Sequence, residues 1–131
     1  MREGNAAHRI ARLMNIKVVA TAANGSFIAR DHEHAYYVLT LDDSREIDCG
    51  DVLGGNFDGH GSLFYSVRNE SKGENVRICL ENWESPLEPA IKMLLNFMKG
   101  RAGKIVAGGL AIASDAPDVA GRLHDTIKRA E

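Results

Sequence analysis

Short segments with strand-forming composition alternate with turn-forming clusters throughout residues 16 to 83, and this pattern restricts the fold more than any other feature. Ile16 to Ala22 is rich in β-branched residues, and residues 23–26 read ANGS. Their Asn-Gly pair favours a tight turn between two antiparallel strands. Phe27 to Arg30 is therefore the second strand of a predicted hairpin.

The same alternation continues up to Trp83. Further predicted strands are His34 to Leu41, Glu46 to Asp48, Val52-Leu53, Ser62 to Val67 and Asn75 to Trp83. Short antiparallel strands joined by close turns fold into a curved sheet or close into a small barrel. We therefore expect a small curved antiparallel sheet, or a partly open barrel, of about five or six strands over residues 16–83.

Helical patterns flank this β region on both sides. Apolar residues recur at helical spacing from Glu3 to Met14, which predicts an amphipathic N-terminal helix. After Ser85, a plausible N-cap, an apolar stripe runs to Gly100, and a last helix begins near Pro117. Gly103 to Ala113 fits a buried strand or a small-residue helix equally well. The expected class is α+β, with two or three C-terminal helices.

The length and composition are those of one globular domain, 1–131. At 131 residues and 14.3 kDa, the chain is long enough for one hydrophobic core and too short for two. Apolar residues make up 44% and charged residues 26%, which excludes the compositions of disordered and fibrous chains. Because the chain has neither a long apolar run nor a secretory leader, we expect a cytoplasmic protein without a membrane partner.

Charge is distributed unevenly along the sequence. Residues 1–30 contain five basic side chains and one acid, whereas residues 31–60 contain eight acids and only Arg45 as a base. Separation of this kind makes a polarised surface if the fold keeps the two segments apart. Residues 31–60, the acidic middle of the chain, also contain most of the glycines of a Gly-rich run. We expect the functional site to lie in this region.

Histidines in the acidic middle are candidate metal ligands. His32 and His34 are two residues apart at the entry to a predicted strand, so they would lie on one face, and His60 would supply a third nitrogen. The order of an HxH strand, a Gly-Asp turn and a later histidine resembles the cupin pattern across residues 25–69. Tyr37 and Val38 stand where cupins place a glutamate. The resemblance implies a barrel with one divalent transition metal.

The glycine-rich run over residues 54–61 is a second candidate. It leads into a predicted strand and its neighbouring charges are negative, so it does not match a phosphate-binding loop. Asp51, Asn56 and Asp58 instead offer oxygen ligands of the kind that divalent cations prefer. The alternative interpretation is a turn at the rim of the sheet without a ligand.

Aromatic residues in the predicted strands raise the question of single-stranded nucleic acid. Adjacent strand residues point to opposite faces, so at most one residue of each aromatic pair, Tyr36-Tyr37 and Phe64-Tyr65, can be exposed. The acidic sheet opposes a phosphate backbone. Nucleic acid would have to follow a basic run outside the sheet, formed by Lys92, Lys99, Arg101 and Lys104.

No combination of residues in the sequence matches an assembled catalytic triad. We therefore expect a non-enzymatic binding module that contacts a protein partner or a second copy of itself and needs no cofactor. The expected binding residues are Asp51, Asn56, Asp58, Tyr37 and Tyr65. The alternatives are a metal-binding, cupin-like barrel or metal-dependent enzyme that uses the three histidines, and a single-stranded nucleic-acid-binding domain.

Overall fold

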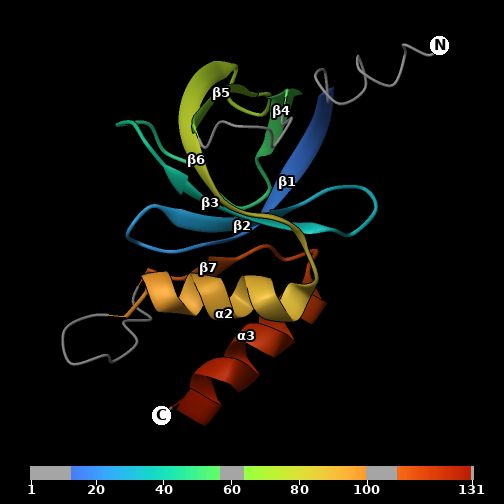
Figure 1. Ribbon diagram of the computed structural model, residues 1–131, viewed down its shortest axis with the longest axis vertical. Coiled ribbons are helices and arrows are strands. Elements are labelled where there is room, and N and C mark those ends of the chain that lie inside the picture. Colours follow the sequence, from blue (N-terminus) through green and yellow to red (C-terminus); the bar gives the residue numbers. More distant parts are fainter. Residues whose placement is uncertain (1–12, 57–63, 100–108, 131) are drawn as a thin grey trace.

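The computed structural model of the chain describes residues 13–56, 64–99 and 109–130 (Figure 1). No helix in these ranges is long and apolar enough to cross a membrane. The described residues form seven strands and two helices: β1 (Leu13–Thr21), β2 (Ser26–Arg30), β3 (Tyr36–Leu41), β4 (Val52–Asn56), β5 (Phe64–Asn69), β6 (Glu74–Ser85), α2 (Leu87–Phe97), β7 (Ala111–Ile112) and α3 (Pro117–Ala130).

Six of the strands close into an antiparallel barrel. Their order around the ring is β2-β3-β6-β5-β4-β1, and β1 pairs with β2 to complete it. The first three strands are a meander, and β4 returns through a longer connection to lie beside β1, which is a Greek-key arrangement. The predicted small antiparallel barrel is confirmed. The expectation that it is partly open is wrong, because β1 pairs along both edges.

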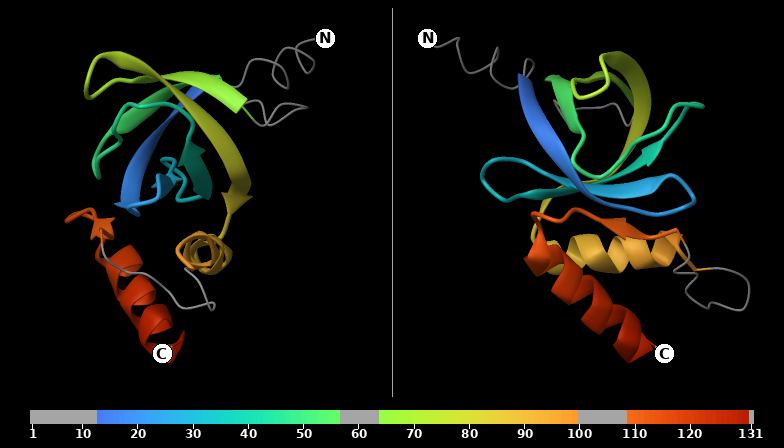
Figure 2. Two further views of the ribbon diagram at one scale, coloured as in Figure 1. Left: turned by 90° about the vertical axis from the view of Figure 1, so that its left-hand side faces the viewer. Right: turned by 180° about the vertical axis from the view of Figure 1, so that it is seen from behind.

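Strand β1 closes the ring because it is long and bulged. Its first half pairs with β4, from Leu13 with Asn56 to Lys17 with Val52, and its second half pairs with β2. The register with β2 shifts between Val18 and Ala20. Such a bulge bends and twists a strand. Beyond it the free edge of β1 pairs with β7, so the end of β1 reaches out of the barrel towards the C-terminal part of the chain (Figures 1 and 2).

Alternation along the strands sends every second side chain into the barrel. On β2, Phe27 is in the interior, whereas Ile28 belongs to the outer cluster against the helices. On β3, Tyr37 lies inside and Tyr36 outside. The fully enclosed interior is apolar and contains Ile16, Val18, Phe27, Ala29, Tyr37, Leu39, Leu53, Val67, Val76, Ile78 and Leu80.

A second apolar cluster lies between the barrel and the helices. Helix α2 covers the outward faces of β2 and β3, and α3 packs against α2 on the side away from the barrel, as Figure 2 shows. The buried helical residues that form this layer are Ala90, Ile91, Leu94, Leu95, Val119 and Leu123. The chain therefore has two cores that share the wall formed by β1, β2 and β3.

Two glycines of the acidic middle are needed where the barrel closes. A Cβ at Gly55 would lie 3.1 Å from Val67 Cγ1, and one at Gly54 would lie 2.6 Å from Asn15 Oδ1. A side chain at residue 54 would displace the flexible ends of Asn15 and Glu70, and one at residue 55 would press on Val67, so the glycines favour close approach of β4 to its neighbours. The interpretation of this run as a turn at the rim of the sheet is wrong for residues 54 and 55, which lie in β4.

Several predicted boundaries differ from the structure. Leu13 and Met14 belong to β1 and not to a helix, and the remainder of that predicted helix lies outside the described residues. Residues 46–48 form no strand, because the connection from β3 to β4 runs across the barrel mouth without a ladder. Helix α2 begins after Pro86, and the Ser85 hydroxyl donates to the Pro86 carbonyl instead of capping. Of the ambiguous segment, Ala111–Ile112 is strand β7.

Candidate functional site

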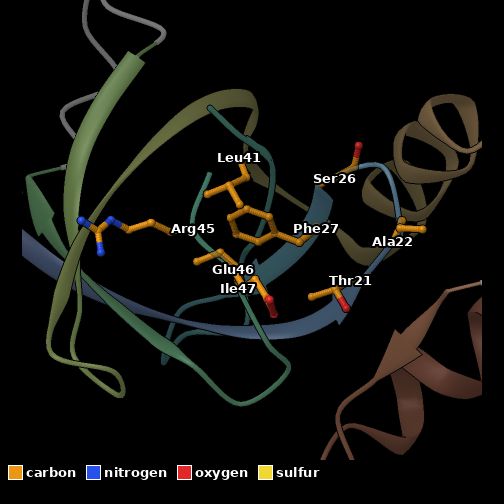
Figure 3. Close-up of a pocket in the computed structure, with 10 residues that line it drawn as sticks. Thr21, Ala22, Ser26, Phe27, Leu41, Arg45, Glu46 and Ile47 are labelled. Carbon is orange, nitrogen blue, oxygen red and sulfur yellow. The ribbon is translucent and has the colours of Figure 1, made fainter. Parts of the chain in front are cut away.

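A cavity of about 240 Å³ opens at one mouth of the barrel (Figure 3). Three separate parts of the chain surround it: the β1–β2 hairpin, the end of β3 and the extended segment that follows β3. Its lining residues are Thr21, Ala22, Ala23, Gly25, Ser26, Phe27, Leu41, Arg45, Glu46 and Ile47. The cavity is thus an open end of the barrel interior, walled on one side by a segment that belongs to no strand.

The floor of the cavity is apolar. Phe27 lies inside the barrel, and Leu41 and Ile47 pack against the same interior cluster. In Figure 3 these two aliphatic side chains gather about the Phe27 ring. Because Leu41 and Ile47 remain partly exposed at the mouth, an apolar group that entered the cavity would bury further apolar surface, at roughly 25 cal/mol per Å².

The rim of the cavity carries one neutralised and one unneutralised charge. Arg45 points away from Phe27 (Figure 3), and its guanidinium forms a 3.1 Å ion pair with Glu74. The carboxylate of Glu46 has neither an ion pair nor a hydrogen bond within residues 13–56, 64–99 and 109–130. The rim is therefore acidic in effect.

The wall segment leaves backbone groups without partners. Residues 45–48 lie in no ladder, and the Glu46 carbonyl accepts a hydrogen bond from Lys72 at 3.0 Å. Within the described part of the chain, nothing pairs with the Glu46 amide or with the amide and carbonyl of Ile47. An extended segment with open backbone groups is a template for pairing with another extended chain.

A polar cluster behind the wall fixes its position. Asn69 is fully buried, and its amide nitrogen donates to Asp51 Oδ2 at 2.9 Å. The same carboxylate oxygen accepts the Asp48 amide at 3.0 Å. Lys72 Nζ lies 2.7 Å from Asp48 Oδ2 and 3.5 Å from Asp51 Oδ2. The hydrogen bond to Asp48 is the main cause that raises the pKa of Lys72 above its ordinary value.

Replacing Lys72 with glutamine is expected to loosen the wall and leave the barrel folded. The substitution removes the charge from three contacts, which for a partly exposed ammonium contribute about 1 kcal/mol. We expect hydrogen exchange of the Asp48, Gly50 and Asp51 amides to accelerate about tenfold. Lys72→Arg, which keeps the charge, should retain most of the protection. Equal exchange in all three proteins would contradict the role of Lys72.

The Cys49 thiol, which contacts the lining residue Thr21, is not an activated nucleophile. The thiol of Cys49 lies 4.0 Å from the Thr21 hydroxyl, and burial, assisted by the negative charges of Asp48 and Asp51, raises the pKa of this thiol. A thiol with a raised pKa is a poor nucleophile at neutral pH.

The predicted metal ligands lie in a turn and not on a strand. His32 and His34 are exposed residues of the β2–β3 connection, and His34 has a left-handed backbone with φ of 64°. The premise that strand alternation places them on one face is therefore wrong. His60 lies outside the described residues, and within those residues no group of three potential ligands could hold a metal ion. The three-histidine site remains a prediction.

The predicted binding residues are not brought together. Tyr37 is fully buried, and its hydroxyl donates to Asp31 at 2.8 Å, so it serves the barrel interior and not a surface. Tyr65 is half-buried against that interior. Asp51 is buried in the polar cluster, Asn56 is exposed at the end of β4, and Asp58 lies outside the described residues. Of the four that the structure describes, Asp51 alone is near the mouth cavity, where it supports the wall.

The basic run predicted for nucleic acid is described only in part. Lys92 and Lys99 are exposed on α2 and beyond its end, while Arg101 and Lys104 lie outside the described residues. Phe64 is the exposed aromatic of its pair, at 52% exposure, with the Arg77 guanidinium 5.9 Å from its ring centre. These groups lie on different elements, and the nucleic-acid hypothesis remains a prediction.

Two further hollows are larger than the mouth cavity. A groove of about 570 Å³ lies between the β2–β3 turn and the starts of α2 and α3. Its polar groups already pair with neighbours: Asp118 accepts from the Tyr36 hydroxyl and faces Arg30, and Arg122 pairs with Glu88. The third, about 350 Å³, is lined by Met14, Asn15, Gly54, Gly55 and Glu70, over the glycines where the barrel closes.

Sequence reasoning missed the residues that form the cavity. Phe27 and Leu41 were assigned to strands without a site, and Ile47 to a short strand that does not exist. The available signal was Ile47 itself, an aliphatic residue among the acids of residues 42–51. Comparison of the chain with protein-family models, curated proteins and solved structures gives no match.

Proposed function

We propose that this chain is a non-enzymatic binding module that receives a side chain of a protein partner in the mouth of its barrel. The observation that carries the proposal is the apolar cavity floored by Phe27, Leu41 and Ile47 and bounded by an extended wall. At about 240 Å³, the cavity is smaller than the roughly 300 to 1,000 Å³ of sites for drug-sized molecules. A single aliphatic side chain matches it better than a cofactor does.

Rigidity of the surroundings supports the same function. The barrel interior beneath the cavity is packed, and the wall is tied to the β5–β6 turn through Lys72 and Asp51. A site that is already formed binds with a smaller loss of conformational entropy than one that must be ordered. The partner would therefore dock on the barrel mouth without rearranging the fold.

Replacing Ile47 with aspartate is expected to abolish binding. The experiment selects random dodecapeptides displayed on phage against the immobilised protein, with bovine serum albumin as the negative selection. We expect the enriched peptides to share one aliphatic position and to lose at least tenfold in affinity for the variant, because a buried apolar contact is replaced by a charge. Retained folding is checked by the proton NMR spectrum.

The control variant is Phe64→Asp, which introduces the same charge at an exposed apolar residue outside the mouth. We expect the selected peptides to bind this control as tightly as they bind the parent. Loss of affinity for the Ile47 variant alone would support a site at the mouth. Absence of enrichment over albumin contradicts the proposal, and so does a selected peptide that loses affinity for the Phe64 variant alone. Should Ile47→Asp fail to fold, Ile47→Ala is expected to weaken binding in the same direction.

A further inference from the structure

The wall of the mouth cavity has features that define what kind of peptide would fit. Residues 45–48 belong to no helix or strand, and the Glu46 amide and both backbone groups of Ile47 have no partner in the described part of the chain. In peptide recognition by strand addition, groups of this kind pair with the backbone of an incoming extended segment, and pockets beside them select side chains.

Charge at the rim adds a second constraint. Glu46 lines the cavity, and its carboxylate has no partner within residues 13–56, 64–99 and 109–130. The other charges of this wall are already compensated: Arg45 pairs with Glu74, and Asp48 pairs with Lys72. A positively charged group of the ligand would therefore be attracted to the Glu46 carboxylate.

We propose that the mouth cavity recognises an extended peptide segment with one aliphatic side chain and a neighbouring lysine or arginine. The inference deepens the proposed function and depends on it. The aliphatic side chain enters the cavity over Phe27, the peptide backbone pairs with the amide and carbonyl of Ile47, and the basic side chain lies against the Glu46 carboxylate. Because the rim is acidic, a nucleic-acid backbone would be repelled from the same place.

The test uses acetylated and amidated hexapeptides in which the residues beside a central leucine are varied between lysine, glutamine and glutamate. Binding to the parent protein is measured by fluorescence polarisation of labelled peptides. We expect the lysine peptides to bind about threefold to fivefold more tightly than the glutamine peptides and the glutamate peptides to bind most weakly, as for a partly exposed ion pair.

Glu46→Lys should invert this order and favour glutamate over lysine. The matched control is Glu33→Lys, which makes the same charge change on the exposed β2–β3 turn, at the other end of those strands. The control is expected to keep the parent's preference. N-methylation of the peptide amide beside the leucine should weaken binding about twofold to tenfold, because it removes one backbone hydrogen bond.

The peptide measurements distinguish failure of this inference from failure of the proposed function. Leucine peptides that bind with no preference among lysine, glutamine and glutamate would overturn the charge assignment and leave the cavity as the binding site. Full affinity of the N-methylated peptide would overturn the backbone pairing. If none of the hexapeptides binds and the phage selection also fails, the proposed function falls together with the inference.

Discussion

Replacing Leu94 with alanine is expected to lower the free energy of unfolding by about 3 kcal/mol. Leu94 lies on α2 and is fully buried in the layer between the helices and the barrel. Truncation of a buried leucine removes its transfer free energy and leaves a cavity, and such changes cost about 2 to 5 kcal/mol. The loss measures how strongly the helices are attached to the barrel wall.

Urea unfolding followed by circular dichroism checks this value. Lys92→Ala, a change on the exposed face of the same helix, serves as the control and should stay within about 0.5 kcal/mol of the parent. A loss below about 1 kcal/mol for Leu94→Ala would mean that α2 is not part of the cooperative core. Because Leu94 faces away from the mouth cavity, peptide affinity of the folded variant should not change.

Replacing Asp31 with alanine is the second large effect, with an expected loss of about 3 kcal/mol. This buried carboxylate accepts the Tyr37 hydroxyl at 2.8 Å and the amides of Glu33 and Ala35 at 2.9 and 3.0 Å. The substitution leaves a hydroxyl inside the barrel and two turn amides without their acceptor. Tyr37→Phe removes only the hydrogen bond from the Tyr37 hydroxyl and keeps the Asp31 carboxylate as the acceptor of the two amides. This substitution should cost about 1 kcal/mol.

The same carboxylate makes stability depend on pH. Burial acts to raise the pKa of Asp31, but the hydrogen bonds from Tyr37, Ala35 and Glu33 outweigh it, and the net pKa lies below the ordinary value. The folded state therefore holds this proton less tightly than the unfolded state does. The contribution is fully present above the unfolded pKa of about 3.9 and is lost as the pH falls through the folded pKa.

Unfolding titrations at several pH values test whether the stabilising contribution of Asp31 is lost as the pH falls. The difference in unfolding free energy between the parent and Asp31→Asn should be constant from about pH 5 to 7, where the Asp31 carboxyl is ionised in both the folded and the unfolded state. It should shrink below about pH 4. A difference that grows as the pH falls would contradict the assignment. Tyr37→Phe removes one of the hydrogen bonds that lower the pKa, so its own pH dependence should be weaker than that of the parent.

The strands were predictable because their signal is local. The Asn-Gly pair before Ser26 sets the first hairpin, with Gly25 in a left-handed conformation at φ of 90°. Alternation then places Phe27 inside the barrel and Ile28 outside. Closure of the ring was not predictable, because the pairing of β1 with β4 joins residues about forty positions apart and depends on close approach at two glycines.

The site was harder to predict than the fold because its parts come from separate segments. Thr21, Leu41 and Ile47 meet only after β1, β2 and β3 have paired, so their spacing in the sequence carries no pattern. Polar residues misled the sequence reading for a physical reason. Asp51 and Tyr37 look like surface ligands, but each is buried and satisfied by a specific hydrogen bond.

The most direct test of the barrel mouth as the binding site is an NMR titration of the ¹⁵N-labelled protein with a leucine-lysine hexapeptide. The account predicts that the largest amide shift changes fall on Thr21, Phe27, Leu41, Glu46 and Ile47, which line the cavity. They should saturate with one affinity and disappear in Ile47→Asp. Saturable shifts centred on α2 and α3, with the amides of the mouth unchanged, would contradict it.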